Sequence, residues 1–588
     1  MAGWRSAAWM LAGVAVMATT AADAGIPKGA ADAQFRKLYT EEYAWRQRQQ
    51  GPSEDSPKND KPGLPDVGPA AQAARLARWT ATLAALNRIK PATLSPAEQV
   101  NYAVYKGQIE ALLNEQKFRD YEKPLNADSS FWGDLVEAGR GDFVREADYR
   151  RYLATLRDMP RYFDQQIENM RAGLKRGFTP PQITLKGRDA GVAKVVDAKT
   201  PADSPFFTPF TKFPAGMPAD VQAKLRVEGE AAIRDAVVPA HAKLLRFLRE
   251  EYIPGARTVL AAYDLPDGHA YYRSKVAEYT TLDQTPEQVH AIGLAEVAKI
   301  RARMHDVMQQ VGFKGDFPAF LKFLRTDPQF YAKTPQDLLD RGAWIAKKFD
   351  GKASKYFGRL PRSRFAIIPV PDDIAPFYTS GRGGPGVYLI NTYNLPARAL
   401  YSLPALTLHE SAPGHAFQMP LAAENKDLPA FRRDTYLSVY GEGWALYSEA
   451  LGEEMGMYET PYELFGMLSY QMWRAARLVV DTGIHAQGWT REQAQQYLHD
   501  NTALADHEIE TEVDRYIAWP GQALSYYTGE LAILNARTRA EKALGGKFNL
   551  RAFHDAVLAL GSVPVPEIDR RIDKLIADGG KGPYPDEE

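Results

Sequence analysis

Cysteine is absent from the 588 residues of this sequence, and histidine is scarce, with 10 copies. The absence of cysteine excludes disulfides, thiolate zinc sites, cysteine nucleophiles and lipid attachment at a cysteine. A transition-metal site therefore has to be built from imidazoles and carboxylates. The positions of the few histidines are for this reason the most informative feature of the chain.

A charge excess of either sign is also missing. The 72 Lys and Arg side chains are balanced by 73 Asp and Glu side chains, which gives a formal net charge of -1. This balance argues against a nucleic-acid partner and against a polybasic membrane-binding patch. Hydrophobic residues make up 45% of the chain, too many for a disordered protein. We expect a globular protein with a sizeable core.

The first 24 residues have the pattern of a secretory signal peptide. Arg5 precedes an apolar run over residues 7–18, and Ala22-Asp23-Ala24 suits cleavage after Ala24. The run is well short of the roughly 20 residues that a membrane span needs, and no later stretch is long and apolar enough. We expect a soluble mature protein exported to a periplasm or beyond. An ordinary N-terminal helix is the alternative.

The rest of the chain is predicted to be mainly α-helical. Residues 25–70 predict a helix followed by a Pro- and Gly-rich linker, and residues 71–588 predict one continuous helical catalytic domain. Thr285-Pro286-Glu287 is typical of a helix start. Strand patterns are confined to residues 365–370 and 386–391, which are rich in β-branched and aromatic residues. The sheet is therefore expected to be small.

Two of the histidines lie in His409-Glu410-Ser411-Ala412-Pro413-Gly414-His415. This segment resembles the zinc-peptidase motif H-E-x-x-H, but its second histidine is six residues after the first instead of four. Residues i and i+6 of a regular helix are about 240° apart, so both imidazoles could not reach one ion. Pro413 cannot continue a helix, and Gly414 tolerates almost any backbone conformation. We expect a kink or bulge here that turns His415 back towards His409.

A catalytic zinc site uses three protein ligands and keeps a fourth position open. Glu442 and Glu449 are seven residues apart and would lie on one helix face. We interpret Glu442 as the third ligand and Glu449 as the carboxylate that orients a ligating histidine. The spacing alone leaves the reverse assignment open, and a solvated helix face is the simpler explanation of either residue.

Four segments in this order resemble the bacterial family named domain of unknown function 885; they are residues 408–418, 441–449, 477–485 and 520–526. That family is similar to the gluzincin metallopeptidases, among which the thimet oligopeptidase and carboxypeptidase Taq types are helical. The resemblance implies a large multi-helix peptidase fold with a small β-sheet near the active site. It also implies one zinc ion, held by two histidines and a downstream glutamate, here His409, His415 and Glu442. Dipeptidyl peptidase III binds zinc despite a lengthened spacing between its histidines, and the family name supplies no substrate.

Glu410 and Tyr526 are the predicted catalytic residues. Glu410 follows a ligand and is expected to take the proton of the attacking water and pass it to the leaving amine. Tyr526 is expected to donate to the oxyanion, because it is the tyrosine that fits the family pattern. Its neighbour Tyr527 is placed on the substrate side. With 30 tyrosines in the chain, core packing is the alternative for both.

Three further groups are candidates for substrate binding. Arg515 could hold a substrate carboxylate, or it could form a local ion pair with Glu512 or Asp514. His485 could face the substrate or be a core histidine at a helix end. His507-Glu508 is the other His-Glu pair of the chain, and no histidine lies four to seven residues after it, so we interpret it as a possible substrate-side group.

The predicted strand over residues 387–391 begins 22 residues before His409 and carries Tyr388. In related peptidases an edge strand at this place pairs with an extended substrate by main-chain hydrogen bonds. We therefore expect Tyr388 to lie on the substrate side. The Gly-rich run at residues 381–386 has no Lys-Ser/Thr after it and is not a phosphate loop.

These patterns predict an exported zinc peptidase with a peptide as its partner. A metal-dependent hydrolase of other amides or esters would use the same residues, and a non-catalytic binding or structural protein could retain the site. The sequence leaves open the oligomeric state and whether internal or terminal peptide bonds are cut.

Overall fold

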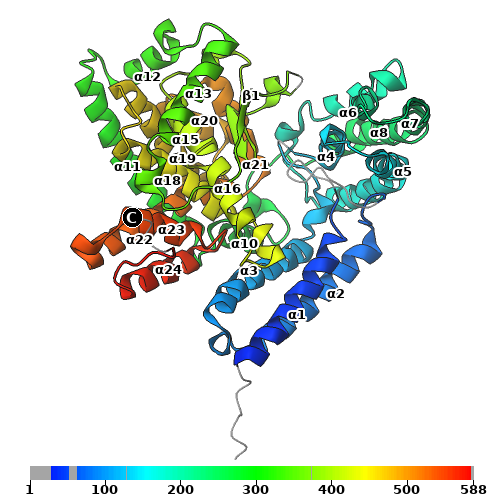
Figure 1. Ribbon diagram of the computed structural model, residues 1–588. Coiled ribbons are helices and arrows are strands. Elements are labelled where there is room, and N and C mark those ends of the chain that lie inside the picture. Colours follow the sequence, from blue (N-terminus) through cyan, green and yellow to red (C-terminus); the bar gives the residue numbers. More distant parts are fainter. Residues whose placement is uncertain (1–27, 52–61, 128, 373, 585–588) are drawn as a thin grey trace, which may run out of the picture.

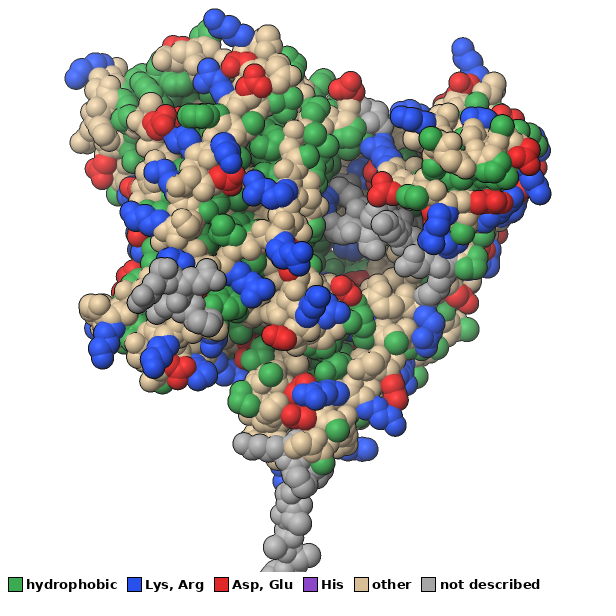
Figure 2. Space-filling view, viewed as in Figure 1, with side chains coloured by type: hydrophobic (Ala, Val, Ile, Leu, Met, Phe, Trp, Pro, Cys, Tyr) green, Lys and Arg blue, Asp and Glu red, His purple; other side chains and the backbone are tan. Residues whose placement is uncertain are grey.

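The computed structural model describes residues 28–51, 62–127, 129–372 and 374–584, and the predicted signal peptide lies outside these ranges. The chain is mainly helical with one three-stranded sheet among the described residues, as predicted. Figure 1 shows a large body formed by the second half of the chain, a smaller lobe beside it and the long N-terminal helices below. The space-filling surface is hollowed between the body and the lobe (Figure 2).

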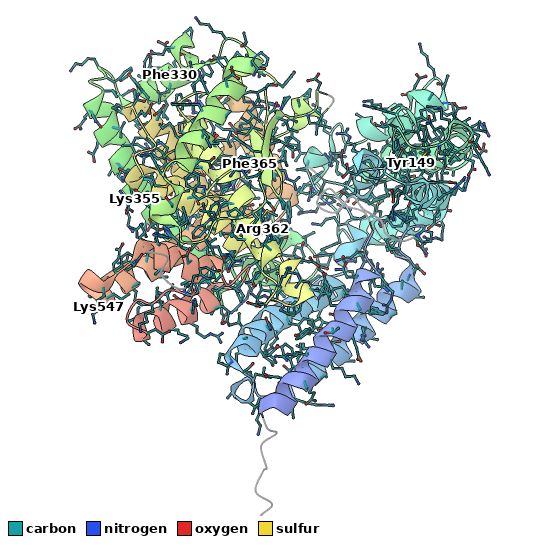
Figure 3. The ribbon with its side chains drawn as sticks, in the orientation of Figure 1. Tyr149, Phe330, Lys355, Arg362, Phe365 and Lys547 are labelled. Atoms are coloured by element: carbon teal, nitrogen blue, oxygen red, sulfur yellow. The ribbon has the colours of Figure 1, made fainter. Side chains whose placement is uncertain are left out.

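The N-terminal half of the chain forms the long helices and the lobe. The long helices are α1 (Lys28–Gln47), α2 (Pro69–Leu86) and α3 (Pro96–Phe118). The lobe contains α4 (Phe131–Glu137), α5 (Glu146–Lys175), α6 (Ala190–Val196), α7 (Ala219–Ala232), α8 (Val238–Phe247) and α9 (Ile253–Gly255). The lobe has its own hydrophobic core, which includes Tyr149 (Figure 3).

The body contains fifteen further helices among the described residues. They are α10 (Gly268–Thr280), α11 (Pro286–Gln310), α12 (Phe317–Thr326), α13 (Pro335–Asp350), α14 (Ala353–Tyr356), α15 (Leu403–Glu410), α16 (His415–Glu424), α17 (Ala430–Arg433), α18 (Ser438–Glu454), α19 (Pro461–Gln487), α20 (Arg491–Asn501), α21 (Asp506–Ala518), α22 (Ser525–Leu544), α23 (Leu550–Leu558) and α24 (Val565–Ala577). A second hydrophobic core, which includes Phe330, joins them to α1–α3 (Figure 3).

Local sequence signals explain how several of these helices begin. The side chain of Thr285 accepts a hydrogen bond from the Gln288 N–H, and Gln288 returns one to the Thr285 N–H, so α11 starts with a capping box. Helix α19 starts the same way at Thr460 and Glu463, and it is buried continuously from Phe465 to His485. Helices α11 and α19 pack along each other, and α19 runs through the interior of the body.

The sheet lies beside α15. Its strands are β1 (Ala366–Pro369), β2 (Gly381–Gly384) and β3 (Val387–Ile390), and their order is β1-β3-β2. Strand β3 pairs with β1 in parallel and with β2 in antiparallel orientation. The two strands predicted from sequence are β1 and β3, but the expected edge strand is the central one. Strand β2 was not predicted because its residues, Gly-Arg-Gly-Gly, have no β propensity.

Helices α18 and α22 cross at two glycines. A Cβ atom on Gly443 would lie 2.5 Å from Gly529 Cα, and a Cβ atom on Gly529 would lie 1.9 Å from the Val439 carbonyl oxygen. Only residues without a side chain allow the two backbones to come this close. None of the described helices combines the length and apolarity that a bilayer crossing needs.

Candidate metal centre

The chain breaks between the two histidines of the motif. Helix α15 ends at Glu410, and α16 begins at His415. A Cβ atom on Gly414 would lie 1.8 Å from the His409 carbonyl oxygen, so the turn folds tightly over the end of α15. The indole N–H of Trp444 donates to the Pro413 carbonyl at 2.8 Å and fixes the turn against α18. The expected break therefore exists as a turn between two helices.

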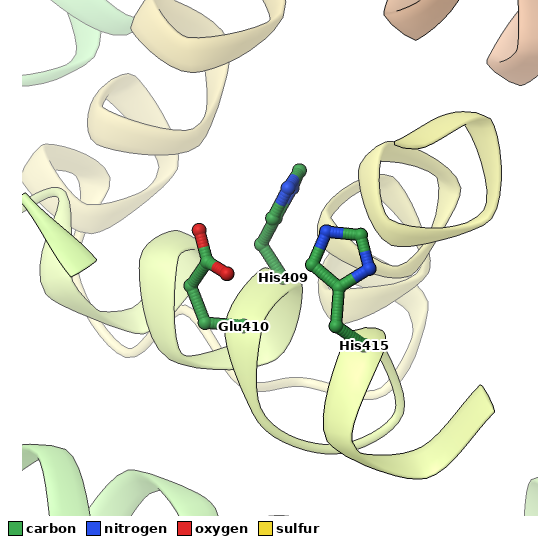
Figure 4. Close-up of side chains that lie close together, drawn as sticks. All are labelled: His409, Glu410 and His415. Carbon is green, nitrogen blue, oxygen red and sulfur yellow. The ribbon is translucent and has the colours of Figure 1, made fainter. Parts of the chain in front are cut away.

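This turn brings His409 and His415 together. Their ring centroids are 4.9 Å apart and the rings are nearly perpendicular, at 87°. Figure 4 shows both imidazoles beside the Glu410 carboxylate. Among the described residues, His409, Glu410 and His415 form one group whose potential ligand atoms lie within 4.8 Å of one another.

Glu442 of α18 completes a three-ligand arrangement. Its Oε2 lies 3.4 Å from His409 Nε2 and 3.3 Å from His415 Nε2. Zinc bonds of about 2.0–2.1 Å in a tetrahedron separate two ligand atoms by about 3.3–3.4 Å. The observed spacings therefore suit a zinc ion held by these three atoms. Glu410 is also near both histidines, but one of its oxygens is engaged by the Gly383 N–H.

The charges of this cluster depend on one another. Burial lowers the pKa of His409, but the carboxylates of Glu410, Glu442 and Glu449 outweigh it and raise this pKa to about 10. Burial raises the pKa of Glu442, yet His415 and His409 hold it well below its usual range. Without a metal, the Glu442 carboxylate is paired with a protonated His409. A bound cation would take the place of the imidazolium proton and keep the carboxylate charged.

Glu449 orients His409 from behind. Its Oε1 lies 2.7 Å from His409 Nδ1, and the side chain is fully buried. A proton on Nδ1 shared with this carboxylate leaves Nε2 directed at Glu442. Arg474 of α19 lies 3.8 Å from the same Oε1 and partly balances its charge. This contact favours Glu449 as the carboxylate that orients His409, and it leaves Glu442 beside the Nε2 atoms of both histidines.

Glu410 is held by the main chain of β2. Its Oε2 accepts a hydrogen bond from the Gly383 N–H at 2.6 Å. A Cβ atom on Gly383 would lie 1.6 Å from the Glu410 carbonyl oxygen, so a larger residue could not make this approach. No sequence pattern predicts this contact, because Gly383 lies 27 residues before Glu410 in a run without strand propensity.

Tyr436 is a further residue of the site that sequence reasoning missed. Its hydroxyl donates to Glu442 Oε1 at 3.1 Å, and 43% of the residue is exposed, so it lies at the mouth of the site. Burial of part of the ring and the charge of Glu442 raise its pKa well above 10. Gly441 makes room for this ring, since a Cβ atom there would lie 2.5 Å from the hydroxyl. No motif marks Tyr436.

Tyr526 and Arg515 contact each other. Arg515 donates to the Tyr526 hydroxyl at 3.2 Å and to Gln522 Oε1 at 2.8 Å, and it also pairs with Glu512 at 3.5 Å. The guanidinium of Arg477 lies 4.2 Å from the centre of the Tyr526 ring. Of the two roles weighed for Arg515, the local ion pair with Glu512 is present in the structure.

Three residues predicted to lie on the substrate side have partners within the protein. His485 is fully buried between Ala262 N–H and the Tyr516 carbonyl, and burial lowers its pKa to about 3, so it is a core histidine. Tyr388 is fully buried on the central strand, where its hydroxyl contacts Thr407. The Tyr527 hydroxyl donates to Glu296 of α11 at 3.2 Å.

Comparison with known proteins gives a family match and structural relatives. The profile of a bacterial protein family of unknown function, DUF885, matches residues 48–572. The structure of a candidate lipoprotein from Colwellia psychrerythraea has a TM-score of 0.84 and 25% identity, with 94% of this chain and 99% of that chain covered. A candidate lipoprotein of unknown function from Shewanella oneidensis has a TM-score of 0.64 and 18% identity, with 93% and 98% covered.

A third solved structure, an M32 carboxypeptidase from Deinococcus radiodurans R1, has a TM-score of 0.28 and 14% identity, with 86% of this chain and all of that chain covered. No curated protein matches the chain. The function therefore has to be argued from the site itself.

Proposed function

Because the chain belongs to the bacterial DUF885 family, whose name assigns no activity, we propose from its site that it is a zinc-dependent hydrolase of peptide bonds. The observation that carries this proposal is the convergence of His409 Nε2 and His415 Nε2 on Glu442 Oε2, at 3.4 and 3.3 Å. A catalytic zinc site uses a donor set of this kind, with two imidazoles and one carboxylate. The contact of His409 with Glu449 adds the orienting carboxylate that such sites have. A zinc ion there would polarise the scissile carbonyl and acidify the attacking water.

Glu410 is the general base in this proposal. It follows His409 directly, lies next to the two histidines, and accepts a hydrogen bond from the Gly383 N–H. This hydrogen bond fixes one carboxylate oxygen and leaves the other free to take a proton from water. The same carboxyl group can then return the proton to the leaving amine.

Tyr526 is the proposed donor to the oxyanion. A tyrosine hydroxyl has one hydrogen to donate and accepts through its lone pairs. Because Arg515 already donates to the hydroxyl oxygen, the Tyr526 hydrogen is directed elsewhere and is available to a substrate oxygen. Tyr436 has the opposite arrangement, since its hydrogen is used by Glu442.

We further propose that the mature protein is exported and acts on peptides outside the cytoplasm. The signal-peptide pattern of residues 1–24 supports this. The candidate lipoproteins from Colwellia psychrerythraea and Shewanella oneidensis are consistent with export. A cysteine-linked lipid anchor is excluded for the present sequence, which has no cysteine.

The substitution Glu410→Gln tests the function. It keeps the shape of the side chain and removes the base, so we expect bound zinc and the melting temperature to persist while kcat falls by about 10²–10⁴-fold. Glu510→Gln, on the exposed face of α21, is the matched control and should retain activity. Hydrolysis is followed on a peptide library, with chelation and zinc restoration as further arms.

Two results would contradict the proposal. One is a purified protein that neither contains nor binds zinc. The other is a Glu410→Gln variant that is as active as the parent. Turnover of ester or non-peptide amide substrates with no cleavage of peptides would favour the related metal-dependent hydrolase instead.

A further inference from the structure

A cavity of about 650 Å³ lies in the body next to the metal centre but contains none of its residues. Its walls come from α12, α13, α15, α19, the start of α21 and the segments around Ser380 and Arg398. The labels α12, α13, α15 and α20 mark this part of the body in Figure 1. The volume lies within the range of about 300–1,000 Å³ that small-molecule sites occupy.

Arg398 supplies a cationic group with few partners to this cavity. Its guanidinium makes one hydrogen bond, to Ser380 Oγ at 3.0 Å, and no ion pair with any described residue. Its Nε is buried without a partner. A guanidinium has five N–H donors, and a buried donor without an acceptor costs about 1–3 kcal/mol. An anionic ligand would remove this cost.

The other charged side chains of the cavity are Lys322, Arg325, Asp506 and Glu508. Arg325 is committed to main-chain carbonyls of His499, Thr502 and Leu504, which makes it a structural clamp. Glu508 faces the same space, but its Oε1 is bonded to the Ser380 hydroxyl at 3.0 Å. Burial raises the pKa of Glu508, and the positive charge of Arg398 opposes this rise, so the two side chains interact electrostatically across the cavity.

The remaining wall is largely apolar. It is formed by Leu338, Leu403, Leu406, Leu504, Tyr401 and Tyr470. The Tyr401 and Tyr470 hydroxyls have no hydrogen-bond partner among the described residues, so each can bond to a ligand. A cavity with a guanidinium whose Nε has no partner, two tyrosine hydroxyls and several leucines suits a carboxylate that is attached to an apolar body.

The cavity and the metal centre share two elements. Leu403 and Leu406 of the cavity lie on α15, the helix that carries His409 and Glu410. Ser380 of the cavity directly precedes β2, whose Gly383 donates to Glu410. At about 3.3 Å per residue, the three residues from Ser380 to Gly383 span about 10 Å. An extended peptide of three residues covers the same length.

We propose that this cavity binds a carboxylate borne on an apolar group, with Arg398 as its anion-binding residue. If the proposed peptidase function holds, the occupant is a part of the substrate about three residues from the scissile bond. The carboxylate is then either the C-terminus of a peptide or an acidic side chain beside apolar residues.

Binding of N-acetyl-leucine tests the cavity without relying on hydrolysis. Calorimetry on the purified full chain compares this carboxylate with N-acetyl-leucinamide, before and after removal of metal by a chelator. We expect the carboxylate to bind at least about tenfold more tightly than the amide, since charge-assisted hydrogen bonds add about 1.5–3 kcal/mol. Binding should survive chelation, because the cavity contains no metal ligand.

The variants Arg398→Gln and Arg398→Lys test whether Arg398 is the residue that binds the carboxylate. Arg398→Gln should abolish the preference for the carboxylate, and Arg398→Lys should restore part of it. Arg364→Gln, which removes the same charge from the exposed segment before β1, is the matched control and should bind like the parent. Equal binding of acid and amide, or an unchanged preference in a folded Arg398→Gln variant, would overturn the proposal. Loss of binding on chelation would also overturn it.

Peptide substrates separate the two sources of the carboxylate. If the C-terminus is bound, amidation of a short peptide should raise KM in the parent but not in Arg398→Gln. If an acidic side chain is bound, replacing Glu by Gln within the peptide should raise KM in the parent but not in Arg398→Gln. Ligand binding without any peptide hydrolysis would support the cavity while refuting the peptidase, so the two proposals fail separately.

Discussion

At the residue scale, His409 has a carboxylate at each ring nitrogen, Glu449 at Nδ1 and Glu442 at Nε2. The motif and its Pro-Gly break were enough to predict that His409 and His415 meet. They were not enough to predict Tyr436 or the Gly383 N–H. Those contacts depend on chain segments that no local pattern connects to the motif. For His485 the sequence left a substrate-side position and a core position open, and the structure places it in the core.

Zinc binding should release a proton from His409. The metal-free imidazole has a pKa of about 10 and is protonated at pH 7, whereas a ligand Nε2 carries no proton. We expect at least one proton to be released per zinc at pH 7. We also expect the apparent affinity to rise about tenfold per pH unit below this pKa.

Calorimetry of zinc binding in buffers with different ionisation enthalpies measures this release. The variant Glu449→Gln removes one of the carboxylates that raise the His409 pKa and should release fewer protons. A binding enthalpy that is the same in all buffers would contradict the expected proton release.

At the scale of elements, the position of α18 depends on its crossing with α22. Gly443 lies between the ligand Glu442 and Trp444, and its Cα approaches the backbone of Gly529. The sequence Gly-Glu-Gly predicted an unusual environment for Glu442, but it could not identify α22 as the neighbour. Strand β2 was missed for a related reason. It forms by pairing with β3, although its own glycine-rich sequence does not favour a strand.

The substitution Gly443→Ala should therefore separate α18 from α22. We expect a loss of about 1–3 kcal/mol in the free energy of unfolding from overpacking, together with weaker zinc binding because Glu442 moves. The control is Gly107→Ala on α3, where a new Cβ atom would meet nothing within 4 Å. That change should leave stability unchanged or raise it by up to about 1 kcal/mol.

Denaturant unfolding and a competitive zinc-binding assay on both variants give these quantities. A Gly443→Ala protein that matches Gly107→Ala in stability and zinc affinity would show that the crossing does not position the metal ligand.

At the scale of the whole molecule, histidines are buried in both cores. Burial lowers the pKa of His241 in the lobe to about 4 and the pKa of His554 in the body to about 3. Each is neutral when folded and gains a proton on unfolding below its usual pKa of about 6.5. The unfolded state thus binds more protons, and stability must fall as pH decreases from about 6.5 towards 3–4.

The expected loss is at most about 1.4 kcal/mol per pH unit for each such histidine. Urea unfolding at several pH values between 4 and 7 measures it. The variant His554→Gln should be less stable at neutral pH, because it loses contacts with Tyr447 and Tyr356, but its stability should depend less on pH. His499→Gln, at a half-exposed site, should keep the slope of the parent, and equal slopes in both variants would refute this account.

The two hydrophobic cores have a consequence for the cooperativity of the molecule. All candidate metal ligands lie in the body, and no residue of the lobe core contributes to the metal cluster. A ligand stabilises only the unit that binds it. Zinc should therefore raise the unfolding temperature of the body alone. The chain then has two thermal transitions that separate further as metal is added, and a single melting temperature does not describe it.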